Sequence, residues 1–182
     1  MKSSDGMRWA WAATLIACAL LAAQQSHSSV EYEMKATAVF NLAQFVDWPP
    51  SAFSDAESPF VIGVLGENPF GKALDRVIAG ESVQKRRLVV KYGQTLDVIG
   101  SVHMLYISRS EARKLPEIFR SLKRRSTLTV SDIDRFAQNG GMVNLVTAGD
   151  RLRMLVNPSQ IEAAGLRASA KLLRIAELVK TE

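Results

Sequence analysis

Cysteine, histidine and aromatic residues are scarce in this sequence of 182 residues, and the first two scarcities restrict what the chain can do. Cys18 is the single cysteine and lies in an N-terminal apolar stretch, so we expect no disulfide in the remainder of the chain. The two histidines, His27 and His103, are far apart in the sequence, and no Asp-rich loop of the calcium-binding type accompanies them. We therefore expect neither a metal site nor a cofactor.

Motifs for covalent or phosphate chemistry are also missing. The chain has no Gly-x-Ser-x-Gly elbow and no nucleophile with an evident histidine base. Gly63, Gly66 and Gly71 lie where a strand end opens a helix, but no Gly-Lys-Ser or Gly-Lys-Thr follows, and Glu67 would repel a phosphate. These glycines are interpreted as turn and packing residues, and the chain is predicted not to be an enzyme.

The N-terminal segment has the pattern of an export signal. Two basic residues precede an apolar run from Trp9 to Ala23, and polar residues follow. The run is too short to span a bilayer comfortably. We predict a secretory signal peptide over residues 1–23, cleaved after Ala23 or, alternatively, after Ser28. A second alternative is a lipoprotein, because the Leu-Ile-Ala-Cys stretch that ends at Cys18 resembles a lipobox.

The remaining residues, 30–182, are predicted to form one globular domain. Hydrophobic residues make up 47% of the chain, which is enough for a single core, and the net charge is a mild +5. The basic residues are scattered, so we expect no nucleic-acid partner, whereas an acidic protein or an anionic lipid surface would suit the charge. Lys85–Arg87 and Lys123–Arg125 are interpreted as solvated faces, with a docking patch as the alternative.

Hydrophobic periodicity predicts alternating strands and helices through this domain. Helices are expected at 30–46, 69–79, 110–122 and 132–140, and strands at 60–66, 87–92, 103–107 and 127–130. Pro116 either kinks its helix or starts a new one. The strands 142–147 and 152–156 form a hairpin, and two short helices divided at Gly165 follow. This order predicts a three-layer α/β sandwich with a mostly parallel central sheet and an antiparallel C-terminal hairpin.

Polar residues follow several predicted strands and are expected to meet at one edge of the sheet. Such an edge is the usual place for a crevice that binds a small polar ligand. The candidate residues are Gly66, Glu67, Asn68, Ser108, Ser110, Ser131 and Asp132. The competing interpretation is that Ser110 and Asp132 only cap the helices they precede.

Trp48 is a separate candidate. It follows the first helix and precedes two prolines, where an indole would serve as a surface anchor for a partner protein. The alternative is that the ring seals the core beneath a loop.

A series of short motifs runs in order through almost the whole chain after the N-terminal segment. The motifs are Tyr32–Ala36, Asn41–Pro49, Pro59–Gly66, Pro69–Gly71, Ile107–Ser110, Leu128–Asp132, Gly140–Val146, Ala163–Leu166 and Lys171–Leu173. Each is short, but together and in this order they resemble the YfiR-like family of exported bacterial proteins.

The resemblance implies a periplasmic regulator that acts by binding another protein. The best-known member of the family holds an inner-membrane diguanylate cyclase inactive through its periplasmic sensor domain, and an outer-membrane lipoprotein relieves the inhibition. For this chain we expect a cyclase or histidine kinase as partner, and a homodimer is left open. The alternative functions are a periplasmic small-ligand binder at the strand-end crevice and an unrecognised hydrolase that uses Asp132. Because the domain lacks the cysteines of the best-known member, redox control does not follow from the resemblance.

Overall fold

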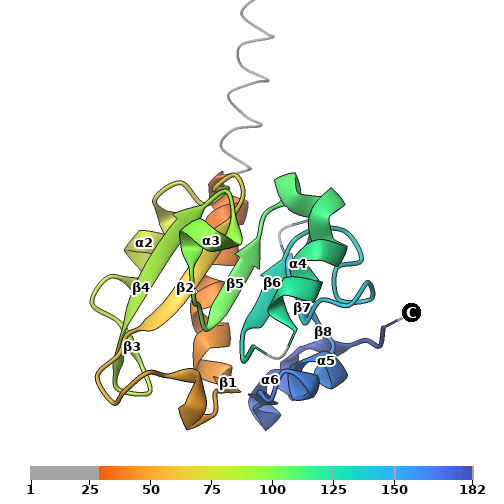
Figure 1. Cartoon of the computed structure of the whole chain (residues 1–182). Coiled ribbons are helices and arrows are strands. Elements are labelled where there is room, and N and C mark those ends of the chain that lie inside the picture. Colours follow the sequence, from red (N-terminus) through yellow and green to blue (C-terminus); the bar gives the residue numbers. More distant parts are fainter. Residues whose placement is uncertain (1–28, 124, 150, 182) are drawn as a thin grey trace, which may run out of the picture.

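A central sheet of eight strands runs through the computed structural model, which describes residues 29–123, 125–149 and 151–181 (Figure 1). The spatial order is β10-β8-β7-β6-β5-β2-β4-β3. The strands are β2 (Phe60–Leu65), β3 (Ser82–Val83), β4 (Arg86–Gly93), β5 (Met104–Ile107), β6 (Leu128–Ser131), β7 (Val143–Ala148), β8 (Arg151–Val156) and β10 (Glu177–Leu178). A second, small sheet pairs β1 (Val46–Asp47) with β9 (Arg167–Ala168). The predicted signal peptide, its cleavage sites and Cys18 lie outside the described residues.

The strands β4, β2, β5, β6 and β7 run parallel to one another, and β7 and β8 form an antiparallel hairpin. The predicted sheet, mostly parallel with an antiparallel C-terminal hairpin, is therefore confirmed. In β2 all six residues are buried, as expected of a strand that is covered on both faces.

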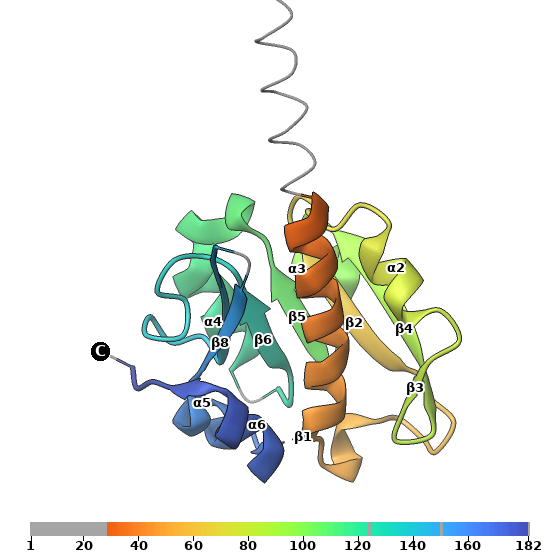
Figure 2. The same cartoon turned by 180° about the vertical axis from the view of Figure 1, so that it is seen from behind.

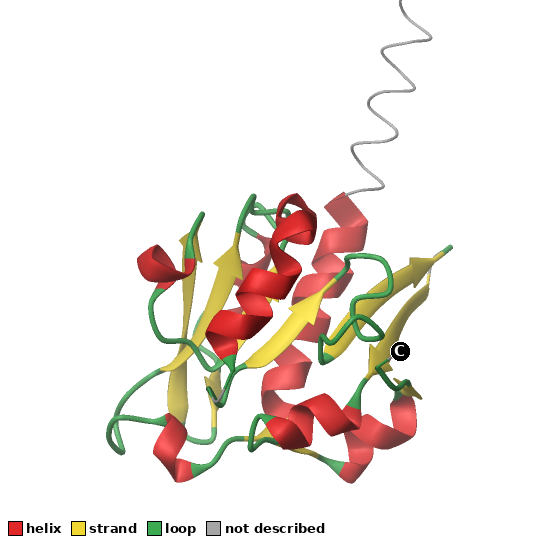
Figure 3. Ribbon diagram, turned by 45° about the vertical axis from the view of Figure 1, so that its right-hand side comes forward, coloured by secondary structure: helices red, strands yellow, loops and turns green. Residues whose placement is uncertain are grey.

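Helices cover both faces of the sheet, as predicted for a three-layer sandwich (Figures 2 and 3). A long N-terminal helix, residues 29–45, and α2 (Ala73–Ile78) lie on one face. The opposite face carries α3 (Leu96–Ile99), the 3-10 turn η2 (Arg109–Lys114) and α4 (Leu115–Leu122). Near the β1–β9 sheet lie α5 (Pro158–Ala163) and α6 (Ala170–Ile175). None of the helices in the described ranges has the length and apolar character needed to cross a bilayer.

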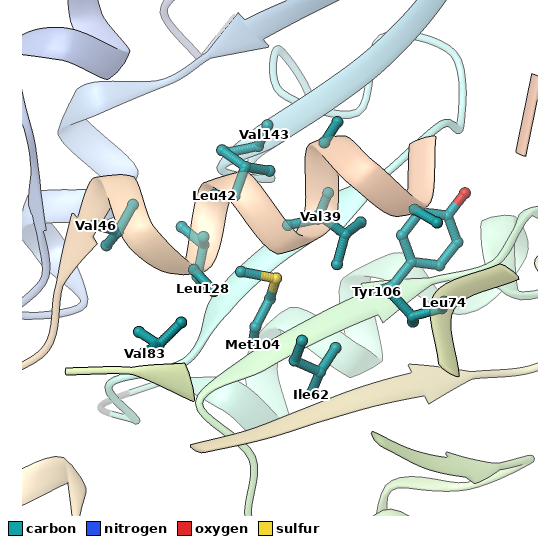
Figure 4. Packing of buried hydrophobic residues seen from close by; sticks show 14 of the residues in the cluster. Val39, Leu42, Val46, Ile62, Leu74, Val83, Met104, Tyr106, Leu128 and Val143 are labelled. Atoms are coloured by element: carbon teal, nitrogen blue, oxygen red, sulfur yellow. The ribbon is translucent and has the colours of Figure 1, made fainter. Parts of the chain in front are cut away.

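The main core lies between the N-terminal helix and the sheet (Figure 4). Val39, Leu42 and Val46 succeed one another at the spacing of helical turns, and each is almost fully buried. They pack in one cluster with β2, β5 and β6 residues, including Ile62, Met104 and Leu128. A smaller core on the other face contains Leu65, Ile99, Leu105, Ile107, Leu115, Ile118, Leu122, Ile133 and Phe136.

The helix predicted over residues 132–140 is wrong, because this segment is a series of turns. Arg135 has a φ of 53°, which a helix does not allow. Asn144 also binds the segment from outside: its amide oxygen accepts a hydrogen bond from the Phe136 N–H at 3.1 Å, and its amide nitrogen donates to the Ile133 carbonyl at 2.9 Å. A side chain on β7 therefore binds backbone groups that a helix would pair internally.

Two other helices begin later in the sequence than the start of their predicted ranges. A new helix, α4, begins at Leu115 with Pro116 in its first turn, which confirms the second of the two alternatives for this proline. By contrast, α2 begins at Ala73, whereas the helix was expected from Pro69. The Asn68 side chain accepts a hydrogen bond from the Phe70 N–H and donates one to the Gly71 carbonyl, so these residues form a turn.

Trp48 closes the core at the end where the parallel strands begin. Its side chain is 6% exposed, and its Nε1–H donates to the His103 carbonyl at 3.0 Å. The ring stands edge-on to Phe60, with 4.7 Å between ring centroids. His103 is itself held in place, because its Nδ1 accepts from the Val61 N–H and its Nε2 donates to the Ala52 carbonyl. The sealing interpretation of Trp48 describes this geometry.

We predict that Trp48→Phe lowers the free energy of unfolding by about 1–3 kcal/mol, because it removes one of the two hydrogen bonds that the buried His103 carbonyl accepts and leaves a gap beside Phe60. Urea unfolding monitored by circular dichroism measures the change. Tyr92→Phe is the matched control, because it removes a single donor from the exposed hydrogen bond to Asp75. Equal stability of the two variants would contradict the assignment of Trp48 to the core.

Candidate functional site

The N-terminal helix begins over the edge of the sheet at which the parallel strands end, and its first turns bring a buried lysine there. Lys35 is 0% exposed. Its Nζ donates to Asp132 Oδ2 at 2.7 Å and to the Glu31 carboxylate one helical turn earlier. A buried ammonium is stable only when it is paired, and here two carboxylates supply the pairing.

Asp132 is the centre of this group because it follows β6 directly. Its Oδ2 also accepts a hydrogen bond from the Tyr32 hydroxyl at 2.9 Å and lies 3.2 Å from Nε of Arg109, which follows β5. From β7, the Thr147 hydroxyl donates to Glu31 at 3.0 Å. The carboxyl ends of parallel strands share one edge of a sheet, which explains why residues so distant in sequence meet. We call Glu31, Tyr32, Lys35, Arg109, Asp132 and Thr147 the Lys35 cluster.

The charges of the Lys35 cluster support one another. Burial by itself would raise the pKa of Asp132, but the hydrogen bond and charge of Lys35, together with Tyr106 and Arg109, lower it below its usual value. The pKa of Glu31 is lowered in the same way, against its own burial, chiefly by Lys35 and Thr147. The lowered pKa values keep the Glu31 and Asp132 carboxylates ionised at neutral pH, where they face Lys35 and Arg109.

Both tyrosines near Asp132 stay protonated. Burial raises the pKa of Tyr32 and of Tyr106, and the negative charge of Asp132 raises each further. Tyr106 comes from β5 and is 0% exposed. Its hydroxyl and Asp132 Oδ1 are buried atoms without a hydrogen-bond partner within the described ranges, although the two residues are close enough to interact electrostatically.

A cavity of about 770 Å³ opens beside the Lys35 cluster. Its wall includes the ends of β6 and β7 and the turn toward β8, with Glu31, Arg109, Asp132, Asp134, Asn144 and Thr147 as polar lining. Three carboxylates and one guanidinium give this wall an acidic excess. A small molecule that carries an amino group for the carboxylates and an anionic group for Arg109 would match it.

Of the residues predicted for a strand-end crevice, only Asp132 lines this cavity. Gly66, Glu67 and Ser110 do meet at one edge, because the Glu67 N–H donates to Ser110 Oγ at 3.1 Å. The strand ends are packed tightly there, since a Cβ on Gly66, whose φ is +90°, would lie 2.3 Å from Ser110 Oγ. Asn68 is occupied by its own turn.

Ser108 and Ser131 lie at the same edge but face the interior, with exposures of 4% and 0%. The Ser131 hydroxyl donates to the Ile107 carbonyl at 2.6 Å and accepts from the Ile133 N–H at 3.0 Å, so it joins β5 to the following turn. Helix capping by Asp132 does not apply, because no helix follows it. Trp48 is remote from this group, beyond the other end of the N-terminal helix.

Sequence reasoning missed most of the cluster: Glu31, Tyr32, Lys35 and Thr147. Arg109 lies within the strand end 108–110 that was predicted for this edge, but no role was assigned to it. One signal was available, because Lys35 falls on the buried stripe of the helix, four residues before Val39. Glu31 lies four residues before Lys35, which is the spacing of a helical ion pair. A lysine on an apolar helix face requires a buried partner, but the sequence does not say which residue supplies it.

Comparison with known proteins identifies one family. A sequence model of the family described as YfiR/HmsC-like matches residues 32–177. No curated protein matches the chain. Within the described ranges, no group of three or more His, Cys, Asp or Glu side chains is arranged to hold a metal ion.

We predict that Lys35→Met lowers the free energy of unfolding by about 3–5 kcal/mol at neutral pH, because it removes the buried cation from the buried Asp132 carboxylate and from the partly buried Glu31 carboxylate. In the native protein, the lowered pKa of Asp132 and Glu31 means that this stabilisation is present above their ordinary pKa and is lost as the pH falls through the lowered values. In the variant, burial raises the pKa of Asp132, so the deficit should shrink on acidification toward about pH 4.

Urea unfolding between neutral and acidic pH measures this deficit. Arg76→Met is the control, because Arg76 and Glu33 form an ion pair in which both side chains are more than half exposed. This variant should differ little from the parent protein at any pH. A deficit for Lys35→Met that is small, or that does not change with pH, would show that Lys35 does not anchor the helix electrostatically.

Proposed function

The chain belongs to the YfiR/HmsC-like family, and we propose that it is a non-enzymatic periplasmic regulator of a membrane signalling protein. In this proposal it binds the periplasmic sensor domain of an inner-membrane protein and holds that protein inactive. Family membership makes a diguanylate cyclase the first candidate partner, so that release of the inhibition raises cyclic di-GMP and promotes biofilm formation. A histidine kinase is the second candidate, and an outer-membrane lipoprotein would relieve the inhibition by sequestration.

The extent of the family match carries this proposal. The matched residues, 32–177, include every strand from β1 to β9 and nearly all of the N-terminal helix. The similarity therefore concerns the whole sandwich and not an isolated motif. The predicted signal peptide supports a periplasmic location, because the regulator and the sensor domain must meet in the same compartment.

The surroundings of His103 support a non-enzymatic role. Both of its ring nitrogens are engaged by backbone groups, and the ring packs against both Phe53 and Phe60, with centroid distances of 4.4 and 5.0 Å. Burial is the main factor that lowers the pKa of His103, which keeps the ring neutral. The residue lies at the start of β5, whereas the cavity lies at the strand ends. A general base for the cavity would have to come from one of its three carboxylates, and two of these, Glu31 and Asp132, are paired with Lys35 and Arg109.

The cavity beside the Lys35 cluster favours a second candidate function, the binding of a small polar ligand. The Arg109 side chain is 63% exposed at its rim, so its guanidinium can meet an anionic group while Nε stays near Asp132. Asp134 is exposed on the same wall and offers a carboxylate to a cationic group. Binding at this place would join the ends of β5, β6 and β7 through one ligand.

We predict that the tagged chain, isolated from the periplasm and mixed with detergent-solubilised inner membranes of the same cells, captures one signalling protein with a periplasmic sensor domain. Mass spectrometry identifies the captured protein, and the N-terminus of the processed chain locates the cleavage site. The control is the periplasmic fraction of cells that lack the gene, taken through the same capture procedure. Recovery of no cyclase or kinase under gentle detergent, or of the intact, unprocessed chain among cytosolic proteins, would contradict the proposal.

For the second candidate we predict that a panel of amino acids contains a ligand that stabilises the protein in a thermal-shift assay. A ligand at a hundred times its dissociation constant adds about 2.7 kcal/mol to the free energy of unfolding. Arg109→Ala should abolish the stabilisation, because it removes the anion-binding group of the wall. The exposed Arg113→Ala is the control and should keep it. A panel without any stabilising member, or equal stabilisation of both variants, would exclude this ligand class at the cavity.

A further inference from the structure

Strand β4 forms an open edge of the central sheet. It pairs with β2 along six consecutive residues, from Leu88 opposite Phe60 to Gly93 opposite Leu65. On its outer side, β3 pairs only with Arg86 and Arg87. Residues 88–93 therefore have no strand beside them on that side within the described part of the chain, as Figure 1 shows for the edge above β3.

The backbone groups that face outward can be assigned from two hydrogen bonds. The Gly93 carbonyl accepts from the Gly66 N–H at 2.9 Å, so Gly93 directs its polar groups toward β2. The Leu88 N–H donates to the Glu81 carbonyl at 3.4 Å, so Leu88 directs its polar groups outward. Successive residues of a strand alternate between the two sides. The N–H and C=O groups of Val90 and Tyr92 consequently face outward, free to accept a further strand.

The side chains of the same strand give the edge its charge. Leu88, Val90 and Tyr92 lie on the face covered by α2, where Leu88 is 9% exposed and the Tyr92 hydroxyl donates to Asp75. Arg87 and Lys91 belong to the alternate set, are exposed, and make no ion pair within the described ranges. A strand added beside the open part of β4 would lie next to Lys91 and would end near Arg87, whose outer side is paired with Ser82 of β3.

This charge selects the occupant. If a second copy of the chain paired its own β4 with this one, the Lys91 side chains would be brought close together, with Arg87 of each copy at the end of the new pair, and like charges on adjacent strands repel. A lysine on an edge strand also prevents indiscriminate pairing. An anionic lipid surface would attract the cations but would not satisfy the outward N–H and C=O groups. An extended acidic segment satisfies both the charges and the backbone groups.

We propose that the outer edge of β4 is a docking strand for an extended acidic segment of the partner protein, which adds to the sheet beside residues 89–93. The inference rests on the proposed function, because the partner is the periplasmic sensor domain described above. The inference also assigns the basic stretch Lys85–Arg87 to docking. The sequence analysis had this role only as the alternative to a solvated face.

A capped peptide of alternating threonine and glutamate is the probe for the edge. We expect it to bind the folded chain and to slow hydrogen exchange at the amides of Val90 and Tyr92, observed by NMR. The same peptide with its alternate amides N-methylated keeps the charge but cannot form the ladder, and a threonine–lysine peptide has the opposite charge. Neither should slow exchange at these amides. Unchanged exchange with the acidic peptide, or equal binding of the N-methylated one, would overturn the inference.

The double variant Arg87→Glu/Lys91→Glu should bind the acidic peptide at least about tenfold more weakly, because two favourable charge contacts become repulsive. The matched control is Arg113→Glu/Lys123→Glu, which makes the same charge change at exposed positions at the two ends of the segment that contains α4. It should bind as the parent does. Equal weakening of both variants would mean that net charge alone explains the effect, and it would overturn the docking strand. Slow exchange at these amides in concentrated protein without any peptide would show that dimers cover the edge, and it would overturn the inference too.

Capture of the membrane partner separates this inference from the proposed function. If the parent chain captures a signalling protein and Arg87→Glu/Lys91→Glu captures it equally well, the regulator stands and the docking strand is wrong. If the parent chain captures none, the proposed function fails, and the peptide experiment decides the properties of the edge independently. Loss of capture in the edge variant alone, with retention in the control, supports both.

Discussion

The contact between Lys35 and Asp132 connects two parts of this fold that are far apart in the sequence. It joins the first helix to the end of β6, 97 residues later, at 2.7 Å and in a fully buried position. Burying either charge alone would be costly, so the packing of the helix against the strand end is most stable when both are present. Glu31, Tyr32, Arg109 and Thr147 complete the arrangement. The N-terminal helix is thereby held across the sheet, with its apolar stripe over β2, β5 and β6.

The parallel sheet explains why the polar groups gather where they do. Its strands end at a common edge, and the residues after β5 and β6 become neighbours of the helix start. The packing at that edge differs from one strand end to the next. Around Gly66 and Ser110 it is packed closely, whereas beside Asp132 it opens into the cavity. The Asn144 side chain maintains the difference, because it holds the turns after Asp132 away from a helical conformation that would alter this wall.

The molecule presents two surfaces that suit a binding protein, and they lie on different parts of the sheet. The cavity is lined from the β6–β7 end and carries an acidic excess, while the β4 edge carries unpaired cations. Opposite charges at the two places favour different ligands, so occupation of one does not compete electrostatically with the other. For a regulator, the first would suit a small polar signal and the second a protein partner. Both surfaces belong to the segment matched by the family.

Local patterns in the sequence were sufficient for the class of fold and for most of its elements, because hydrophobic periodicity is a property of neighbouring residues. The helix predicted over 30–46, the strands around β2, β4, β5 and β6, and the C-terminal hairpin all depend on such patterns. The order of short motifs was likewise enough to indicate the family. Tertiary structure decided the partner of Lys35, the turns after Asp132, the burial of Trp48 and the position of the cavity. Each of these depends on a contact between residues distant in the chain, and periodicity carries no information about which distant residue will supply it.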